Sequence, residues 1–79
     1  MMNKYWVDVK SNDEVCFDSY YFELDDVKGL DINEAIIGTD GLVWDRIAEE
    51  RNITTQKAKD EFYVVDLYED ESDETVYVL

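Results

Sequence analysis

The chain begins and ends with the same pattern, in which two runs rich in β-branched and aromatic residues flank a short polar or acidic turn. The runs cover residues 5–9 and 15–24 near the start and residues 63–68 and 75–79 near the end, with turns at 11–14 and 69–74. β-branched and aromatic residues favour strands, and Asn, Asp and Ser favour the turns between them. We therefore expect a β-hairpin at each end of the chain.

The segment between the hairpins is typical of short helices. After a loop at residues 25–29, we expect a short helix that begins at Asp31 and runs to about residue 37, a second from 42 to about 51, and a third that ends near 62. Their expected N-caps, in chain order, are Asp31, Asp40 and Thr54 or Thr55. The elements predict one α+β domain over residues 1–79, in the order ββ-ααα-ββ, with the short helices packed on one face of a small antiparallel sheet.

Strand periodicity assigns side chains to the two faces of this sheet. In the third strand we expect an inward set of Tyr63, Val65 and Leu67. The outward set is then Asp66, Tyr68 and Asp70, joined by Trp6, Asp8 and Lys10 on the first strand. If the two hairpins pair edge to edge, their acidic tips gather carboxylates at one end of the sheet. The alternative is that acidic residues simply populate turns.

The charge balance limits the partners of such a domain. Seven Lys and Arg against 21 Asp and Glu leave a net charge of −14. An ordinary binder of nucleic-acid backbone or anionic membrane is excluded, because these ligands are repelled at long range. Disordered acidic tails are poor in aromatic residues, whereas this chain is 14% aromatic, so we expect it to fold. Solubility alone needs a charge magnitude of about 2–8 in a small domain, and the excess therefore indicates a function.

Patterns for catalysis and metal binding are missing from the sequence. It has no histidine, and its lone Cys16 cannot form an internal disulfide. The acidic runs do not match EF-hand spacing, and no glycine-rich phosphate loop or nucleophile elbow is present. We expect a non-catalytic protein without cofactor or metal. The lack of a signal peptide or a long apolar run predicts a cytoplasmic location.

Residues 42–60 resemble a helix-turn-helix unit. Asn52 occupies the turn, Ile53 is the turn hydrophobe, and Thr54 begins a second helix whose exposed residues are Thr55, Gln56 and Lys59. Four of the seven basic residues lie in this segment. The resemblance implies DNA binding, but the same pattern also occurs in helices that only pack together. Because the net charge opposes phosphate contacts, we favour packing.

In size, charge and lack of catalytic motifs, the whole chain resembles the small acidic inhibitors encoded by phages and mobile elements, which include DNA-mimic anti-restriction and anti-CRISPR proteins. This resemblance of composition implies competition for a cationic surface, with carboxylates replacing phosphates and aromatic rings stacking on guanidinium groups. The implied partner is a basic nucleic-acid-binding protein, such as a nuclease or a CRISPR or restriction component. We expect the residues that bind it to be Trp6, Asp8, Asp66, Tyr68, Glu69, Asp70, Glu71, Asp73 and Glu74.

A second interpretation stays open. The chain is then a protein–protein interaction module, such as an assembly protein or an antidote to a basic toxin. Its contact is an apolar patch, and the acidic surface serves solubility.

Overall fold

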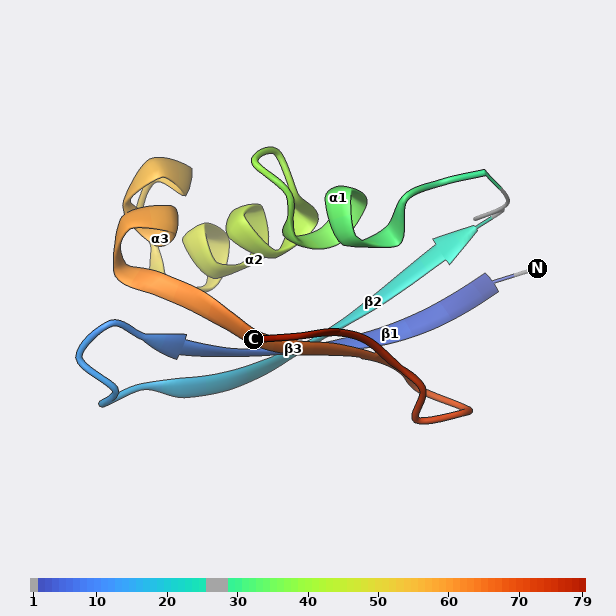
Figure 1. Cartoon of the computed structure of the whole chain (residues 1–79). Coiled ribbons are helices and arrows are strands. Elements are labelled where there is room, and N and C mark those ends of the chain that lie inside the picture. Colours follow the sequence, from blue (N-terminus) through green and yellow to red (C-terminus); the bar gives the residue numbers. More distant parts are fainter. Residues whose placement is uncertain (1, 26–28) are drawn as a thin grey trace.

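Seven elements follow one another along the chain (Figure 1). The structure is a computed structural model that describes residues 2–25 and 29–79. The elements are β1 (Met2–Ser11), β2 (Phe17–Asp25), α1 (Ile32–Ile37), α2 (Leu42–Arg51), α3 (Thr55–Glu61), β3 (Phe62–Glu69) and β4 (Thr75–Val78). The predicted α+β class is confirmed, with two terminal hairpins and three helices between them. Most of the loop expected at 25–29 falls on residues 26–28, which lie outside the described residues.

The two hairpins pair edge to edge through their inner strands. The strand order is β2-β1-β3-β4, and every neighbouring pair is antiparallel. In the first turn, Asn12 donates its backbone N–H to the carbonyl of Glu61, next to the start of β3. In the second turn, Asp70 donates its backbone N–H to the carbonyl of Lys4, near the start of β1. The two acidic tips therefore lie at opposite ends of the sheet (Figure 1), and the expectation that they gather at one end is wrong.

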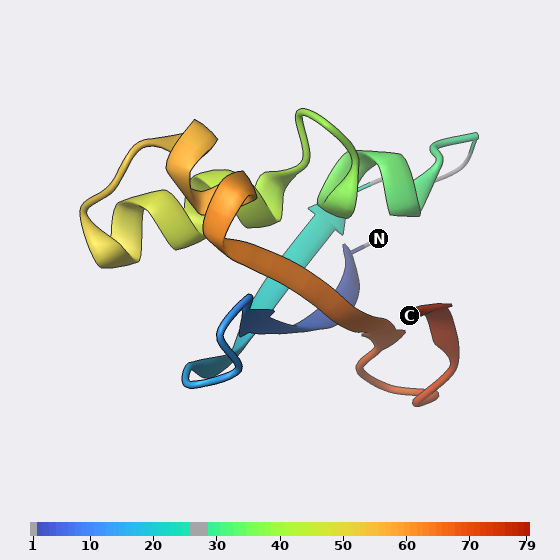
Figure 2. The same cartoon turned by 60° about the vertical axis from the view of Figure 1, so that its left-hand side comes forward.

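All three helices lie on one face of the sheet, and the core fills the space between the two layers (Figures 1 and 2). Burial of apolar surface there is the main force that holds the layers together. The buried hydrophobic residues are Tyr5, Val7, Val9, Tyr20, Phe22, Phe62, Val64 and Leu67 from the strands and Ile36, Val43, Ile47, Ala48 and Ala58 from the helices. Within residues 2–25 and 29–79, no helix is long and apolar enough to cross a membrane.

Side-chain caps begin two of the helices as expected. Asp31 accepts a hydrogen bond from the backbone N–H of Glu34 at the start of α1, and Thr54 accepts one from Lys57 at the start of α3. The expected cap Asp40 is wrong, because the N-cap of α2 is Gly41, which makes no side-chain cap. The chain doubles back so tightly at Gly41 that a Cβ atom would lie 2.3 Å from the carbonyl oxygen of Ile36. Only glycine fits this approach.

Strand β3 contains one residue more than its pairing with β1 requires. Asp8 pairs with Asp66 and Val9 with Val64, so Val65 forms a β-bulge between them. The side-chain alternation changes phase at this point. Leu67 is buried and Asp66 and Tyr68 lie on the other face, as predicted. The inward assignment of Tyr63 and Val65 is wrong: ahead of the bulge, Phe62 and Val64 face the helices instead.

Candidate partner-binding face

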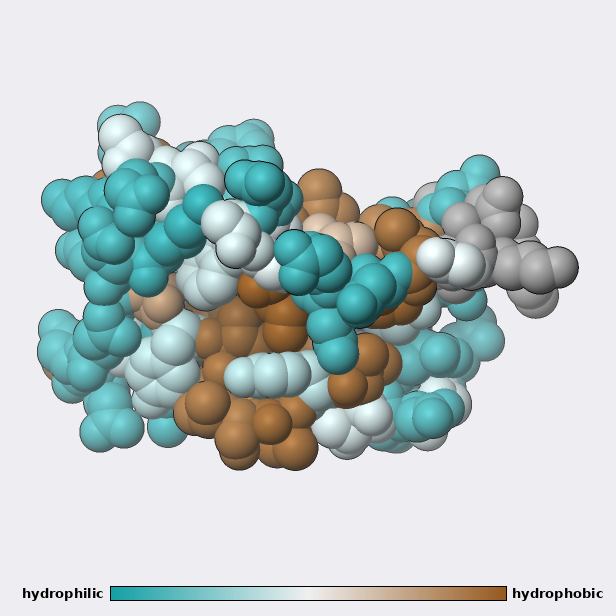
Figure 3. Space-filling model, turned by 45° about the horizontal axis from the view of Figure 1, so that its top comes forward, coloured by the Kyte–Doolittle hydropathy of each residue, from teal (hydrophilic) through white to brown (hydrophobic). Residues whose placement is uncertain are grey.

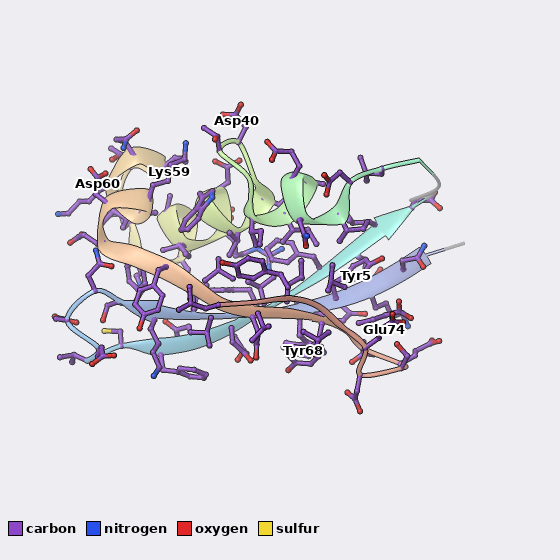
Figure 4. The ribbon with its side chains drawn as sticks, viewed as in Figure 1. Tyr5, Asp40, Lys59, Asp60, Tyr68 and Glu74 are labelled. Carbon is purple, nitrogen blue, oxygen red and sulfur yellow. The ribbon has the colours of Figure 1, made fainter. Side chains whose placement is uncertain are left out.

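The face of the sheet that points away from the helices, called the open face below, arranges its side chains in rows that cross the strands. One row, the aromatic row, consists of Tyr21, Trp6 and Tyr68, from β2, β1 and β3. The next row, the carboxylate row, consists of Ser19, Asp8 and Asp66 from the same three strands. In Figure 4, Tyr68 lies on the side of the sheet away from the helices. The pleat thus places rings and acids side by side on one surface.

Polar contacts hold the aromatic row in place. The ring centroids of Trp6 and Tyr21 lie 5.2 Å apart, with their planes tilted by 55°, within the range of favourable aromatic pairs. Trp6 Nε1 donates a hydrogen bond to Asp70 Oδ1 at 2.7 Å, and the Tyr21 hydroxyl donates one to Glu23 Oε1 at 3.1 Å. Trp6, Tyr21 and Tyr68 are each only partly buried. A partner can therefore contact Trp6 and Tyr21 in orientations that these interactions already fix.

The carboxylate row brings two like charges together. Asp8 and Asp66 lie directly opposite each other on β1 and β3, a position in which like charges destabilise a sheet. The Ser19 hydroxyl donates a hydrogen bond to Asp8 Oδ1. Among the described residues, Oδ1 of Asp66 is buried and has no hydrogen-bond partner. Burial, reinforced by the Asp8 carboxylate, raises the pKa of Asp66 to about 6. At neutral pH the pair therefore concentrates negative charge that nothing on the described chain neutralises.

The turn between β3 and β4 adds further acids next to the rings. Figure 1 shows this turn bending toward the open face. Burial raises the pKa of Tyr21, with further contributions from Glu23 and from turn residues Asp70 and Glu71. Burial also raises the pKa of Tyr68, and Asp73 of the turn adds to that effect. The turn thus extends the negative potential of the open face beyond the end of the sheet.

The structure brings most of the expected partner-binding residues together. Those on the open face or hydrogen-bonded to it are Trp6, Asp8, Asp66, Tyr68 and Asp70. Glu71 and Asp73 lie in the adjoining turn, and Glu74 is exposed at its end. Glu69 lies apart from them, because it pairs with Tyr5, whose side chain points toward the helices. Burial raises the pKa of Tyr5, and the charge of Glu69 raises it further.

Sequence reasoning missed Ser19 and Tyr21 as members of this face. Both lie in a run, Phe17–Asp25, in which Tyr20, Tyr21 and Phe22 are consecutive aromatic residues. Such a run hides the period of two, so the sequence does not show which ring faces the core. The pairing of Tyr21 with Trp6 supplies the missing information.

A second surface is apolar. A groove of about 480 Å³ opens between the helices and the β3–β4 hairpin. Its lining includes the hydrophobic residues Ile37, Trp44, Tyr77 and Leu79, with Asp31, Asn33 and Glu34 at its α1 side. Figure 3 shows hydrophobic residues gathered on this side of the molecule. The outer strand β4 and the residue that follows it, residues 75–79, contain no charged side chain. Val78 and Leu79 are 68% and 75% exposed. The other outer strand, β2, carries several acids, which is the usual protection of a sheet edge.

Several polar side chains of the helix-turn-helix-like segment contact the rest of the chain. Arg46 lies 4.6 Å from the centre of the Phe22 ring and Arg51 lies 4.8 Å from that of Phe62, so both bind α2 to the sheet. Arg51 also forms an ion pair with Asp18. Thr55 donates its hydroxyl hydrogen to Asp45 at 3.0 Å. These contacts link α2 to β2, β3 and the start of α3.

Among the described residues, no group of three or more Cys, Asp or Glu side chains is arranged to hold a metal ion. Comparison of the chain with protein-family models, with curated proteins and with solved structures finds no match. The open face, with its aromatic and carboxylate rows, is the candidate partner-binding site.

Proposed function

We propose that this protein is a non-catalytic inhibitor that occupies the cationic nucleic-acid-binding surface of another protein in the cytoplasm, with restriction and CRISPR components as the natural targets. One observation carries this proposal: the aromatic row and the carboxylate row lie next to each other on the face of the sheet that the helices leave uncovered. Carboxylates accept hydrogen bonds from arginine, and rings stack on its guanidinium plane.

The size and charge of the molecule support the same function. Its longest dimension is 35 Å, and B-DNA of that length carries about 20 phosphate charges. The chain has 21 Asp and Glu. A surface that binds DNA would therefore find about as many acidic groups on this protein as on a DNA segment of the same length. Long-range attraction accelerates the encounter, and the aromatic row adds affinity that salt does not screen.

Two variants with equal loss of charge test the role of the open face. The open-face variant combines Asp8→Asn, Asp66→Asn and Asp70→Asn. The helix-layer variant combines Asp40→Asn, Glu49→Gln and Glu50→Gln, three exposed acids on or next to α2, on the opposite side of the molecule. Each variant and the wild type are immobilised as bait in bacterial lysate, at low and at high salt. Duplex DNA is then used to displace whatever protein is captured.

We expect wild type and the helix-layer variant to capture the same basic protein and to release it to duplex DNA. The open-face variant should capture much less of it. If both variants lose capture equally, bulk charge rather than a face is responsible. If DNA displaces nothing, the captured protein is not held through its nucleic-acid-binding surface and the proposed inhibition is wrong.

The apolar groove favours a second candidate function, an interaction module that binds through hydrophobic contact. Trp44 and Leu79 line the groove, and Leu79 is largely exposed. A contact at this groove should survive high salt and be lost on Leu79→Asp, while the open-face variant keeps it. The same bait experiment, run with Leu79→Asp, distinguishes the two candidates.

A further inference from the structure

We propose that the open face selects arginine over lysine: a guanidinium group of the partner lies against the aromatic row and donates hydrogen bonds to both Asp8 and Asp66. This inference rests on the proposed function, because it names the partner chemistry of the same face. It goes further by assigning the selectivity to the adjacency of two rows instead of to charge alone.

The spacing of the two acids suits a planar, forked donor. Asp8 and Asp66 are opposed on neighbouring strands, where Cβ atoms are about 4.5–5.5 Å apart. A guanidinium group carries five N–H donors in a fixed plane and can donate to two carboxylates at once. Because Oδ1 of Asp66 is buried, we expect the guanidinium group to donate to the other oxygen of this carboxylate and to Asp8. An ammonium group offers a compact charge without a plane, and its strong hydration makes the same burial less favourable.

The aromatic row supplies the second half of the site. Tyr68 follows Asp66 by two residues on β3, and Trp6 precedes Asp8 by two on β1. Side chains two apart on a strand lie on the same face, about 7 Å apart. A guanidinium held by the acids therefore meets the neighbouring rings, and such stacking strengthens as the contact excludes water. The chain already uses this chemistry internally, where Arg46 lies over Phe22 and Arg51 over Phe62.

No basic side chain of the described residues forms an ion pair at this position. Among residues 2–25 and 29–79, neither Asp8 nor Asp66 forms an ion pair, and the described pair of Arg51 with Asp18 lies elsewhere. Lys10 is the nearest cation in sequence to Asp8 on the open face of β1, and across from Asp66 on β4 lies the uncharged Val78. Within the described part of the chain the pair keeps its charge, which a cationic partner can complement.

Binding of arginine at this position displaces a proton when the two acids share one. The titratable groups that face Asp66 are Asp8 and Lys10 from β1 and Tyr68 from its own strand, while Ser19 of β2 and Val78 of β4 do not titrate. Of these, Asp66 is the group whose pKa is raised to about 6, by burial and by the neighbouring Asp8 carboxylate. Affinity for arginine should accordingly fall as the pH is lowered from 7 to 5.

The test uses two probes of equal charge, hexa-arginine and hexa-lysine, titrated into the full chain at moderate salt and followed by calorimetry. We expect hexa-arginine to bind about tenfold more tightly, the scale of one stacked, bidentate contact. Asp66→Asn and Tyr68→Leu should each reduce this ratio toward one. Asp40→Asn removes the same charge as Asp66→Asn on the helix side and should keep the ratio.

Circular dichroism of each variant confirms that it is folded before its affinity is compared. Equal affinity of the wild type for the two probes, or a ratio unchanged by Asp66→Asn, overturns the arginine site. The bait experiment is separate. If the captured protein depends on the open face and is displaced by DNA while the two probes bind equally, inhibition stands and arginine selectivity fails. If the ratio is as expected but DNA displaces nothing, selectivity stands and inhibition fails.

Discussion

The two faces of this sheet are built from the same strands, one residue apart, and follow opposite rules. On the covered face, Val7, Val9 and Leu67 are completely buried beneath the helices. On the open face, their neighbours Trp6, Asp8 and Tyr68 are partly exposed, and two carboxylates lie opposite each other without a cation between them. The covered face is arranged as stability requires. The open face contains an arrangement that costs stability, so stability does not explain it.

The destabilising arrangement on the open face indicates that this face has a function. A polar, charged open face is normal for an antiparallel sheet and needs no explanation. Opposed acids beside a row of oriented rings are not needed for solubility, which the turns and helices already supply. Such local conflicts between sequence and stability tend to mark functional sites.

The largest effect on stability is expected on the covered face. Leu67→Ala should lower the free energy of unfolding by about 3 kcal/mol, because it leaves a cavity in the core. Tyr68→Ala, one residue further along β3, should lower it by less than about 1 kcal/mol. Urea unfolding of the two variants measures the contrast. Equal losses would show that the open face is also part of the structural core.

The largest effect on binding is expected from the acids at the end of the open face. Replacing Asp70, Glu71 and Asp73 with Asn or Gln should weaken binding of the partner by about 100-fold, or about 2.7 kcal/mol, and flatten its salt dependence. Asp40, Glu49 and Glu50 serve as the comparison, because their replacement removes the same number of charges on or next to α2. Their replacement should weaken binding less. Titrations at several salt concentrations separate the two sets, and similar losses for both would contradict a defined face.

Substituting an aromatic residue and substituting an acid should change the salt dependence of partner binding in different ways. Tyr68→Ala should weaken binding about tenfold, or about 1.4 kcal/mol, with the slope of affinity against salt nearly unchanged, since a stacked ring releases no ions. Trp6→Ala should behave in the same way, with an additional effect because Asp70 loses its hydrogen-bond donor. A slope that falls along with affinity would indicate that the ring only positions the acids.

The opposed carboxylates should make one substitution stabilising. Asp66 binds its proton more tightly in the folded chain, with a pKa of about 6 against an ordinary 3.8. The folded state is therefore favoured by this group as the pH falls from about 7 to about 4, and is disfavoured above pH 6. Asp66→Asn should raise stability at pH 7 by about 1 kcal/mol, allowing for solvent screening of a partly exposed group.

This advantage of Asp66→Asn over the wild type should shrink as the pH is lowered to 5, because the wild type then acquires the proton. Thermal unfolding of both proteins across this range measures the difference. Asp40→Asn, which removes an acid from an exposed loop next to α2, is the control. A constant difference would mean that Asp8 and Asp66 do not share a proton.

The smallest effect concerns salt and the whole fold. Moderate salt should raise the melting temperature of the wild type by roughly 3 °C, well under 1 kcal/mol in a domain of this size, because the Debye length shortens to about 8–10 Å and screens repulsion among the acids. The open-face variant should respond less than the helix-layer variant, which keeps the opposed pair. Equal responses would mean that repulsion is spread evenly over both sides.

Much of the fold could be predicted from the sequence because its signals are local. Asp31 and Thr54 begin their helices by contacts within three residues, and the strand runs are distinct. What the sequence did not show depends on pairing. The bulge at Val65 becomes visible only against β1, and the position of Tyr21 only beside Trp6. The N-cap of α2 is Gly41 and not the predicted Asp40. The tight backbone contact of Gly41 with Ile36 is not encoded by any local pattern.

For the candidate site, too, the sequence predicted what depends on one strand and did not predict what depends on strand pairing. Asp66, Tyr68 and Asp70 were placed together by the alternation of one strand. That Asp8 opposes Asp66 follows from the antiparallel pairing of the two hairpins, which brings together residues 58 positions apart in the sequence. The same pairing moved the two acidic tips apart, so a correct local prediction led to a wrong arrangement at the larger scale.

The uncharged outer edge at β4 has a consequence for how copies of this protein behave in concentrated solution. Residues 75–79 expose backbone and apolar side chains with no charge of their own, so what keeps two such edges apart is the overall repulsion between molecules that each carry −14. Added salt weakens this colloidal barrier while it strengthens each fold. A single solution variable thus acts in opposite directions on the protein, favouring the folded chain and also the association of folded chains.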